Sequence, residues 1–401
     1  MMEPTVRFPE FKDSWNNYKI EDMFDRVGTP VDLDDTQTYR EIGIRSHGKG
    51  IFHKEETNAT EIGNKRVFWV EPDCFVVNIV FAWERAVAKT TEKENGMIAS
   101  HRFPMYKPKK NIVDLDYITE YFITKRGQNV LILASPGGAG RNKTLGQKEF
   151  AKSVVKLPSL PEQQKIAEFL STIDTVIEKQ KETVSAWEER KKGVMQKLFS
   201  QEVRFKADDG SDFPEWEEKK LGEIADIYDG VHQTPEYVSN GVKFVSVENI
   251  ENIYSTNKYI TQEAFERDYK NNIPKKWDIL MTRIGDVGRV ALIDDDEQLA
   301  YYVSLALIRV SSNFIPQFFV QALRSDFFQA ELWKNMLHTA YPKKINKQDI
   351  GKCKVKFPVS IVEQQKIADC LSSLDEVIEK QKATLAAWEE LKKGLLQQMF
   401  V

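Results

Sequence analysis

The sequence is poor in cysteine and in long apolar runs, and each scarcity excludes a class of protein. Its 401 residues include three cysteines, Cys74, Cys353 and Cys370, which follow no CxxC or other ligand spacing, so neither a disulfide framework nor a zinc site is predicted. The longest apolar run, residues 74–83, has about half the length of a membrane span. The first residues lack the apolar centre of a signal peptide. We therefore expect a soluble protein of the cytoplasm.

Catalytic and cofactor-binding motifs are missing as well. The five histidines show neither HExxH nor another metal spacing, and no GxSxG or NPPY-like tetrapeptide occurs. Gly43, Gly48 and Lys49 satisfy the GxxxxGK of a phosphate loop, but Gly50 stands where that loop needs Ser or Thr. The glycine-rich stretch before Lys143 does not complete GxGxxG, because Lys143 replaces the last glycine. We expect no metal, no cofactor and no catalysis by this chain.

Positive charge is scarce overall but is concentrated in two regions. The formal net charge is −4, which taken alone argues against a nucleic-acid partner. Residues 101–160 nevertheless hold eleven Lys and Arg against four Asp and Glu, and residues 324–356 hold eight against three. Both basic regions end just before a copy of the hexapeptide EQQKIA, so the two charge concentrations belong to a repeated pattern.

The repeat extends well beyond the hexapeptide. Residues 162–199 align without gaps on residues 363–400, and 25 of the 38 positions are identical. VRF at Val6 recurs at Val203, each copy followed by a tryptophan, and the stretches from Asn111 and from Asn313 both predict a short amphipathic helix. The chain is therefore a tandem duplication of about 200 residues, in which a globular part precedes a terminal helix.

The terminal helices carry an apolar heptad over five repeats, which predicts a coiled coil. Because the second globular part must bridge only a short distance if the helices run in opposite directions, we expect antiparallel pairing. The chain thus has two globular domains separated by two long helices, which form an antiparallel coiled coil with a pseudo-twofold axis. Gln180 and Gln381 either fix the register from core positions or are partly solvated and neutral to it. The predicted interface residues are Ile166, Leu170, Ile173, Ile177, Gln180, Trp187, Ile367, Leu371, Leu374, Ile378, Gln381 and Trp388.

This layout resembles the specificity (S) subunit of type I restriction-modification systems over essentially the whole chain. The resemblance is carried by VRFPEF and FPEW at the starts of the two copies, by LPSLPEQQKIAEFLSTID at the first junction, and by DILMTRIGDVGRVALI in the second domain. The second junction, FPVSIVEQQKIA, departs by one extra residue and a missing proline. We place the domains at residues 1–157 and 201–357 and the spacer helices at 158–200 and 358–401.

The resemblance implies a sequence-specific subunit that binds double-stranded DNA at an asymmetric bipartite target. It would position two methyltransferase (modification) subunits and, in a restricting complex, restriction subunits. The chain itself would be non-catalytic, whereas the assembled complex would methylate adenine N6 and act as an ATP-dependent type I endonuclease. Each globular part would be a target recognition domain, a mixed α+β unit that reads a few base pairs in the major groove, so the resemblance implies the fold class α+β.

Candidate DNA-binding residues in the first domain lie in two glycine-containing loops. Arg45, His47 and Lys49 surround Gly48, and Arg and Lys are the usual partners of guanine and phosphate; a purely structural glycine turn is the alternative. Residues 137–140 predict a turn after a strand, which would present Arg141, Asn142 and Lys143. The matching positions of the second copy include Lys343 and Lys344, so both domains would place cations there to anchor phosphates, unless these are ordinary solvated loops.

In the second domain a polar turn contains His232, Gln233 and Thr234. Gln can read adenine through N6 and N7, and Thr can contact a base or the thymine methyl group; a turn with local hydrogen bonds is the alternative. Arg283 belongs to TRIGDVGR, which predicts a hairpin that presents guanidinium groups, and it could instead pair with Asp286 or the acids at 294–296.

Two other classes of function remain open at this point. A coiled-coil scaffold whose globular parts bind proteins would show no DNA sequence preference, and a nucleotide-dependent enzyme would bind ATP or NAD tightly.

Overall fold

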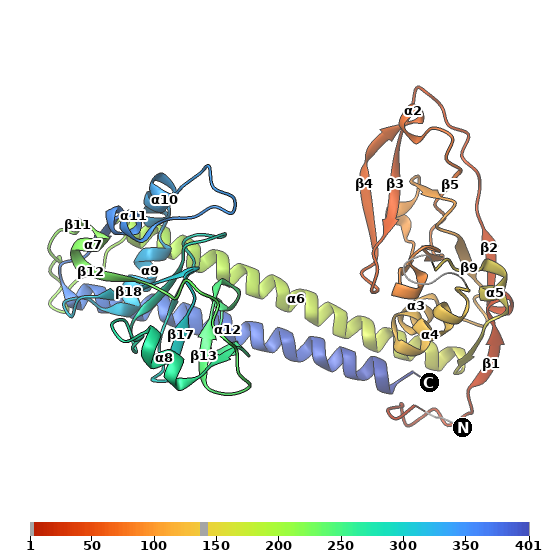
Figure 1. Ribbon diagram of the computed structural model, residues 1–401. Coiled ribbons are helices and arrows are strands. Elements are labelled where there is room, and N and C mark those ends of the chain that lie inside the picture. The colour runs from red at the N-terminus through yellow and green to blue at the C-terminus, as the bar shows by residue number, and fades with distance from the viewer. Residues whose placement is uncertain (1–3, 137–142, 401) are drawn as a thin grey trace. The chain divides into compact units, whose positions relative to one another are not determined.

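The computed structural model describes residues 4–136 and 143–400, which form two compact α+β units (Figure 1). Unit 1 combines the described residues up to Lys181 with those from Ala383 onward, and unit 2 is the continuous segment 182–382. Each long helix therefore contributes one part to each unit. The α+β class with two long helices is confirmed. Among the residues that the structure describes, no helix combines the length and the apolar character that a membrane crossing needs.

Unit 1 contains two four-stranded sheets. The first is antiparallel throughout, in the order β2 (Phe24–Val27), β9 (Met105–Pro108), β6 (Phe75–Val77) and β7 (Val87–Lys89). The second has the order β4 (Ile51–Asn58), β3 (Thr38–Ile44), β8 (Ile98–Ser100) and β5 (Val67–Trp69), with β3 and β8 parallel. Strands β1 (Asn16–Lys19) and β10 (Val154–Leu157) form a separate antiparallel pair.

Unit 2 repeats this plan, with three strands instead of four in its second sheet. Its antiparallel sheet has the order β12 (Ala225–Asp229), β18 (Leu305–Val310), β15 (Ile279–Thr282) and β16 (Val290–Leu292). Its second sheet has the order β14 (Tyr259–Ile260), β13 (Val242–Val245) and β17 (Leu299–Tyr301), with β13 and β17 parallel. Strands β11 (Glu217–Lys220) and β19 (Lys354–Phe357) form the separate pair. The duplication is thus visible in strands whose sequences differ.

Helices cover one face of the antiparallel sheet in each unit. In unit 1 they are α1 (Ile20–Met23), α3 (Leu115–Ile123), α4 (Lys125–Leu133) and α5 (Gln147–Lys152), with α2 (Ala59–Ile62) beside β4. In unit 2 they are α7 (Leu221–Ile224), α9 (Pro316–Arg324), α10 (Asp326–Asn335) and α11 (Lys347–Lys352), with α8 (Gln262–Asp268) against the second sheet. Helices α3 and α9 confirm the two amphipathic segments predicted from sequence.

The antiparallel sheet is buried on both faces because successive side chains of a strand point to opposite sides. In β15, Ile279 and Met281 join the core under the helices, whereas Leu280 joins the core shared with the second sheet. Unit 1 does the same, since Phe75 and Val77 face the helices and Val76 faces the other way. This double burial explains why these strands read as continuous apolar runs rather than as an alternating pattern.

The two long helices, α6 (Leu160–Phe199) and α12 (Ile361–Gln398), bury the heptad positions predicted from sequence. The twelve predicted interface residues are all buried or partly buried, and Ile166, Leu170 and Leu371 are almost completely inaccessible. Gln180, Trp187, Gln381 and Trp388 are only partly buried. In unit 1 the start of α6 packs with Leu395 and Met399 of α12; in unit 2 the end of α6 packs with the start of α12.

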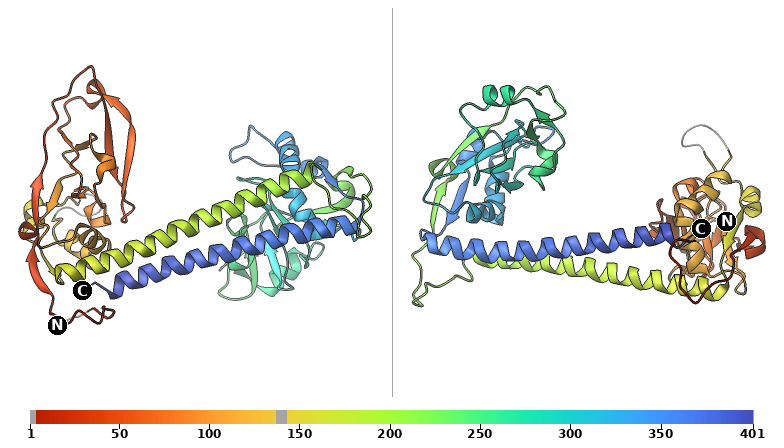
Figure 2. Two further views of the ribbon diagram at one scale, coloured as in Figure 1. Left: turned by 180° about the vertical axis from the view of Figure 1, so that it is seen from behind. Right: turned by 90° about the horizontal axis from the view of Figure 1, so that it is seen from below.

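Ion pairs establish that the helices run in opposite directions within each unit. In unit 1 Lys392 Nζ lies 2.7 Å from Asp174 Oδ1, and in unit 2 Lys191 Nζ lies 2.5 Å from Asp375 Oδ1. Further along, Lys382 pairs with Glu188 at 3.0 Å in unit 2. As the residue number rises along one helix it falls along the other, and Figures 1 and 2 show the start of α6 beside the end of α12 in unit 1. Antiparallel pairing is therefore confirmed inside both units.

The repeated hexapeptide holds each unit together through its first residue. Glu162 is buried and accepts two hydrogen bonds from Arg7, Nε to Oε1 at 2.7 Å and Nη2 to Oε2 at 2.8 Å. Glu363 is equally buried and accepts the same two bonds from Arg204 at 3.1 and 3.0 Å, and a third from Trp216 Nε1. Such bidentate pairs are strong and geometrically specific. They fix the VRF segment against the start of a long helix in both units.

The second residue of the hexapeptide attaches the helical layer. Gln163 Oε1 accepts from the backbone N–H of Asp114, which caps α3, and its Nε2 donates to the carbonyl of Pro158 at 3.0 Å. Gln364 repeats this with the N–H of Ile315 before α9 and the carbonyl of Pro358. The hexapeptide occurs twice because each unit needs the same buried carboxylate and amide at this junction.

The last turn of each long helix completes a unit in the same way. Phe400 lies against Tyr117 and Tyr121 of α3 in unit 1, and Phe199 lies against Trp216 and Phe318 in unit 2. The N–H of Val6 donates to the carbonyl of Gln398, as that of Val203 donates to Lys197. The residues at the end of α12 therefore make in unit 1 the aromatic and backbone contacts that the residues at the end of α6 make in unit 2.

Replacing Glu363 by alanine should destabilise unit 2 by about 3–5 kcal/mol, because it leaves the Arg204 guanidinium partly buried without its carboxylate partner. Urea unfolding followed by tryptophan fluorescence measures the change, since Trp216 lies at this junction. Glu376→Ala, at an exposed position of the same helix, is the matched control and should change the unfolding free energy by less than about 0.5 kcal/mol. Equal stability of the two variants would contradict the assigned role of Glu363.

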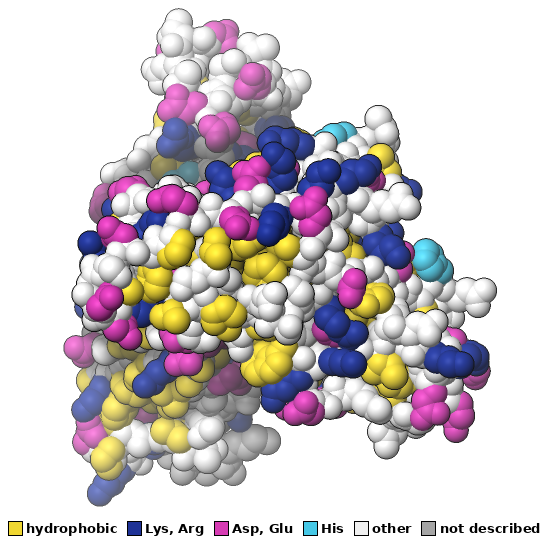
Figure 3. All heavy atoms as spheres, turned by 90° about the vertical axis from the view of Figure 1, so that its left-hand side faces the viewer, with side chains coloured by type: hydrophobic (Ala, Val, Ile, Leu, Met, Phe, Trp, Pro, Cys, Tyr) yellow, Lys and Arg dark blue, Asp and Glu magenta, His cyan; other side chains and the backbone are white. Residues whose placement is uncertain are grey.

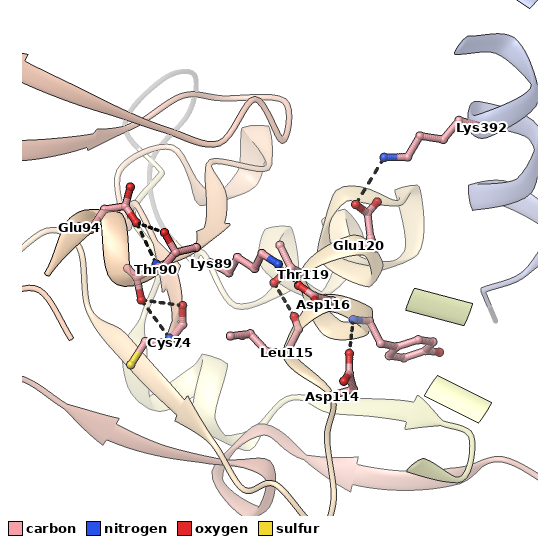
Figure 4. A network of polar contacts seen from close by, with 12 residues as sticks. Cys74, Lys89, Thr90, Glu94, Asp114, Leu115, Asp116, Thr119, Glu120 and Lys392 are labelled. Carbon is pink, nitrogen blue, oxygen red and sulfur yellow. Dashed lines mark hydrogen bonds and ion pairs between the residues drawn. The ribbon is translucent and has the colours of Figure 1, made fainter. Parts of the chain in front are cut away.

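In unit 1 helix α3 places a partly buried charge against α12 (Figure 4). Glu120 of α3 points toward Lys392 of α12, with 3.4 Å between Oε1 and Nζ, and its Oε2 has no hydrogen-bond partner. Burial raises the pKa of this carboxyl, the Lys392 ammonium opposes the rise, and Asp174 adds to it. The equivalent residue in unit 2 is the neutral Gln321, which donates to Asp375 at 3.1 Å.

We expect Glu120→Gln to raise the thermal midpoint at pH 7, since it removes a buried charge. The pKa of Glu120 is raised in the folded chain, so the folded chain binds a proton at a higher pH than the unfolded chain does. As the pH falls toward the ordinary carboxyl pKa, protonation of Glu120 therefore stabilises unit 1. The difference between variant and wild type should therefore shrink from pH 7 toward pH 5 in calorimetric scans. Glu168→Gln, exposed on α6, should leave the pH profile unchanged; a constant difference for Glu120→Gln would refute the assignment.

Candidate DNA interface

The loop that carries Arg45, His47 and Lys49 is the tip of the β3–β4 hairpin. At its base the N–H of Arg45 donates to the carbonyl of Gly50 at 3.0 Å, and in its middle the N–H groups of His47 and Gly48 donate to the carbonyls of Glu84 and Arg85 at 2.7 and 2.9 Å. Gly48 has a φ of 68°, and a Cβ there would collide with Ile123 of α3. A strand follows this loop, whereas a phosphate-binding loop is followed by a helix. The loop is therefore the turn of a β-hairpin and lacks the geometry of a nucleotide-binding loop.

The three predicted side chains of this loop are all exposed. The Arg45 guanidinium lies 4.8 Å from the centre of the Phe52 ring and weakly contacts the carbonyl of Ile51. Among the described residues neither His47 nor Lys49 has an ion-pair partner. The loop therefore presents donors to solvent from a backbone that is held at its base.

The second predicted loop of unit 1 is only partly described. Arg141 and Asn142 lie outside the described residues, and Lys143 is half-buried, next to Leu145, whose N–H donates to Ile79. The expected strand before this loop is wrong: residues 125–133 form helix α4. Thr124 caps it by accepting from the N–H of Gly127, and Gly127 allows close packing on Tyr121. A short apolar run such as VLIL cannot distinguish a strand from a packed helix.

In unit 2 three predicted segments converge although they are far apart in the sequence. Val231 exchanges backbone bonds with the turn at 301–303, and Arg283 donates its N–H to Ser304 in the same turn. Residues 284 and 344 form a β-bridge, and the N–H of Gly285 donates to Lys343 at 2.8 Å. The bases of the loops that hold residues 232–234, 283–289 and 343–344 are thus joined by backbone hydrogen bonds.

Arg283 departs from the role expected of it. Its side chain is 11% exposed and forms an ion pair with Asp229, at the start of the loop that holds residues 232–234. The sequence left open an exposed guanidinium or an ion pair with Asp286 or the acids at 294–296, and Asp286 approaches Arg289 instead. Burial lowers the pKa of Arg283, yet arginine stays charged at any ordinary pH. Arg283 therefore braces the loop bases, and the hairpin predicted around it is confirmed by the pairing of β15 with β16.

The remaining predicted residues of unit 2 are exposed. His232, Gln233 and Thr234 follow Gly230, where a Cβ would lie 2.4 Å from the carbonyl oxygen of Tyr301, so only glycine permits this approach of the loop. Lys343 and Lys344 are exposed beside the 283–289 hairpin. The polar loop of unit 2 joins β12 to β13, whereas that of unit 1 joins β3 to β4. The two predicted loops are therefore not structural equivalents, which the dissimilar sequences could not reveal.

Sequence reasoning missed aromatic residues near these lysines. Trp333 and Tyr341 are exposed, and the ring of His338 lies tilted against that of Trp333, with 4.6 Å between ring centres. Charge alone does not mark the interface, because on the face shown in Figure 3 Lys and Arg are interspersed with Asp and Glu and with apolar side chains. The tyrosine close to two adjacent lysines in HTAYPKK was the available signal.

Two copies of one α+β framework with unlike loops define a class: a modular recognition protein with two different binding surfaces. Among the residues described, no group of three His, Cys, Asp or Glu side chains could hold a metal ion. The chain belongs to the family of the type I restriction modification DNA specificity domain, whose model matches residues 12–185 and again 214–387.

Curated relatives agree with this assignment. The chain is 27% identical to the type I restriction enzyme MjaVIII specificity subunit of Methanocaldococcus jannaschii, over 84% of this chain and 80% of that protein. It is 24% identical to a putative MjaX specificity subunit of the same organism, over 93% and 86%. The resemblance stated from sequence is therefore confirmed at the level of the family.

Solved structures share the fold over the full length. The S subunit of a type I restriction-modification system from M. genitalium matches with a TM-score of 0.60 at 16% identity, covering 100% of this chain and 99% of that one. A structure from work on complex assembly and conformational transition of the type I R-M system matches with a TM-score of 0.58 at 15% identity, covering 98% of both chains. At these identities the likeness concerns the fold.

Arg283→Gln should lower the unfolding free energy of unit 2 by about 1–3 kcal/mol, because the carboxylate of Asp229 loses its buried partner. Arg289→Gln, whose side chain is 41% exposed, should cost less than about 0.5 kcal/mol. Thermal unfolding of the two variants compares them directly. Indistinguishable midpoints would show that Arg283 does not brace the loops.

Proposed function

We propose that this chain is the DNA-reading subunit of a type I restriction-modification complex, and that each unit recognises one half of an asymmetric bipartite target. The observation that carries the proposal is the repetition of one framework with unlike exposed loops. Equal frameworks hold both units in the same way, while His47 and Lys49 in unit 1 and Gln233 and Thr234 in unit 2 offer different hydrogen-bonding groups to base edges. Two unlike half-sites follow from two unlike loops.

The partners are double-stranded DNA and two methyltransferase subunits, with restriction subunits in a cleaving complex. The exposed faces of α6 and α12 favour protein partners over DNA, since residues 162–200 hold seven basic and seven acidic side chains. The antiparallel pairing of the helices offers two similar surfaces, one in each unit, which suits two copies of the same partner. The chain would select the DNA target sequence, and the partners would supply S-adenosylmethionine-dependent methylation of adenine N6 and ATP-driven cleavage.

Methylome sequencing of a host that expresses the chain with its methyltransferase tests the proposal. The expected result is one motif with two different half-sites separated by a fixed number of base pairs. The double variant Gln233→Ala, Thr234→Ala should change or relax one half-site and leave the other and the gap unchanged, since both side chains are exposed and outside the core. Glu236→Ala, exposed in the same loop, is the control.

Two results would favour the other classes of function. A scaffold without sequence specificity would give no methylated motif and no preference among random duplexes in mobility-shift assays, with or without the methyltransferase. A nucleotide-dependent enzyme would bind ATP or NAD tightly in calorimetry of the isolated chain.

A further inference from the structure

The basic segment at 324–356 separates into paired and unpaired cations once its contacts are known. Four of its eight cations have an acidic partner: Arg324 approaches Asp375, and three lysines pair as Lys334 with Glu331, Lys352 with Asp349 and Lys354 with Glu218. Within the described ranges the other four, Lys343, Lys344, Lys347 and Lys356, form no ion pair, and Lys343 and Lys344 are adjacent and both exposed. Their charge is therefore available to an external anion.

Lys343 is held in place by an aromatic side chain. Its ammonium lies 4.5 Å from the centre of the Trp333 ring, within the range of a cation–π interaction. Trp333 is 54% exposed, and the His338 ring lies tilted against it while His338 Nε2 contacts the Trp333 carbonyl at 2.8 Å. The tryptophan orients the lysine without removing its charge from solvent.

The loop that carries these residues is fixed at its base and free at its tip. Backbone bonds run from Leu337 to Lys344, from Gly285 to Lys343 and from Ile345 to Arg283, all between 2.8 and 3.0 Å. Tyr341 at the tip is fully exposed, and the loop after α10 projects from unit 2 in Figure 1. The exposed ring of Tyr341, whose hydroxyl has no hydrogen-bond partner among the described residues, is suited to contact a ligand that binds from solution.

We propose that Tyr341, Lys343 and Lys344, with Trp333 as the positioning residue of Lys343, form a sequence-neutral clamp on the phosphate backbone of duplex DNA beside the half-site read by unit 2. This rests on the proposed function. Lysine ammonium groups and the tyrosine hydroxyl are donors that contact phosphates in protein–DNA complexes. Exposed tryptophan and tyrosine also occur in protein interfaces, but lysine is depleted there, and the hydrogen-bonded base of this loop adjoins the loop of residues 232–234.

The test measures DNA affinity of the complex of this chain with its methyltransferase as a function of salt. For Lys343→Gln with Lys344→Gln, the slope of log K against log salt should fall in magnitude by about two, with weaker binding to cognate and non-cognate duplexes alike. The methylated motif should not change. Lys352→Gln and Lys354→Gln, which remove paired cations of the same segment, should leave the slope unchanged.

Two further variants separate the roles of the rings. Trp333→Leu should weaken binding, but should add nothing once Lys343 is Gln, because the tryptophan acts through that lysine. Tyr341→Phe removes only the hydroxyl and should weaken binding nearly as much as Tyr341→Ala. Circular dichroism and thermal midpoints, expected unchanged for these exposed positions, exclude misfolding.

Three outcomes would overturn the clamp: an unchanged salt slope, a changed base preference at one half-site, or weakened methyltransferase binding with normal DNA affinity. The last outcome would assign the surface to a protein partner. If the wild-type complex shows no sequence-specific DNA binding, the proposed function fails. If it binds specifically and the variants match it, only the clamp fails.

Discussion

A buried carboxylate at the start of each long helix is the constraint on which both units depend. A charge inside a protein is tolerated only with a partner in good geometry, and Glu162 and Glu363 find theirs in Arg7 and Arg204, about 155–160 residues away in sequence. The pair forces the segment before the first strand against the head of the helix that follows the last strand. The adjacent glutamine then attaches the helical layer. Two consecutive residues thus close one α+β unit, which is why their hexapeptide is retained twice.

The repeated elements could be predicted from the sequence, but the side-chain contacts between them could not. The heptads of α6 and α12, their antiparallel direction and the helices α3 and α9 followed from periodicity and from the length of chain between them. The partnership of Arg7 with Glu162 did not, although VRF and EQQKIA both recur, because identical copies offer two equal choices of partner. For Arg283 the sequence left open an exposed role or an ion pair with acids close to it in the chain, whereas the sheet brings the distant Asp229 to it. Helix α4 was mistaken for a strand because four apolar residues fit either form.

The loops could diverge because the framework supports them through backbone atoms. Gln128 and Gln329 occupy equivalent positions, and each donates to a carbonyl of the connection between two sheet strands, Trp83 in one unit and Gly288 in the other. Since a backbone carbonyl is present whatever the side chain, this attachment does not restrict the residues of the loop. The loop of residues 45–50 is likewise attached through the backbone N–H groups of His47 and Gly48, so an exposed side chain such as that of Lys49 can change at little cost in stability.

The same framework is closed differently in the two units, and this gives them different folding requirements. Unit 2 is continuous, so Phe199 and Val203 reach their positions through a few peptide bonds. Unit 1 joins residues 4–181 to residues 383–400 by contact alone: Phe400 on Tyr117 and Tyr121, Val6 on Gln398, and Lys392 on Asp174. Because domains fold as units during synthesis, unit 2 can be complete before the segment that finishes unit 1 exists. The apolar surface around Tyr117 stays exposed until the end of α12 docks on it. Burial of the aromatic cluster offsets the entropy that this docking costs, whereas in unit 2 the corresponding segments are already close together in the chain.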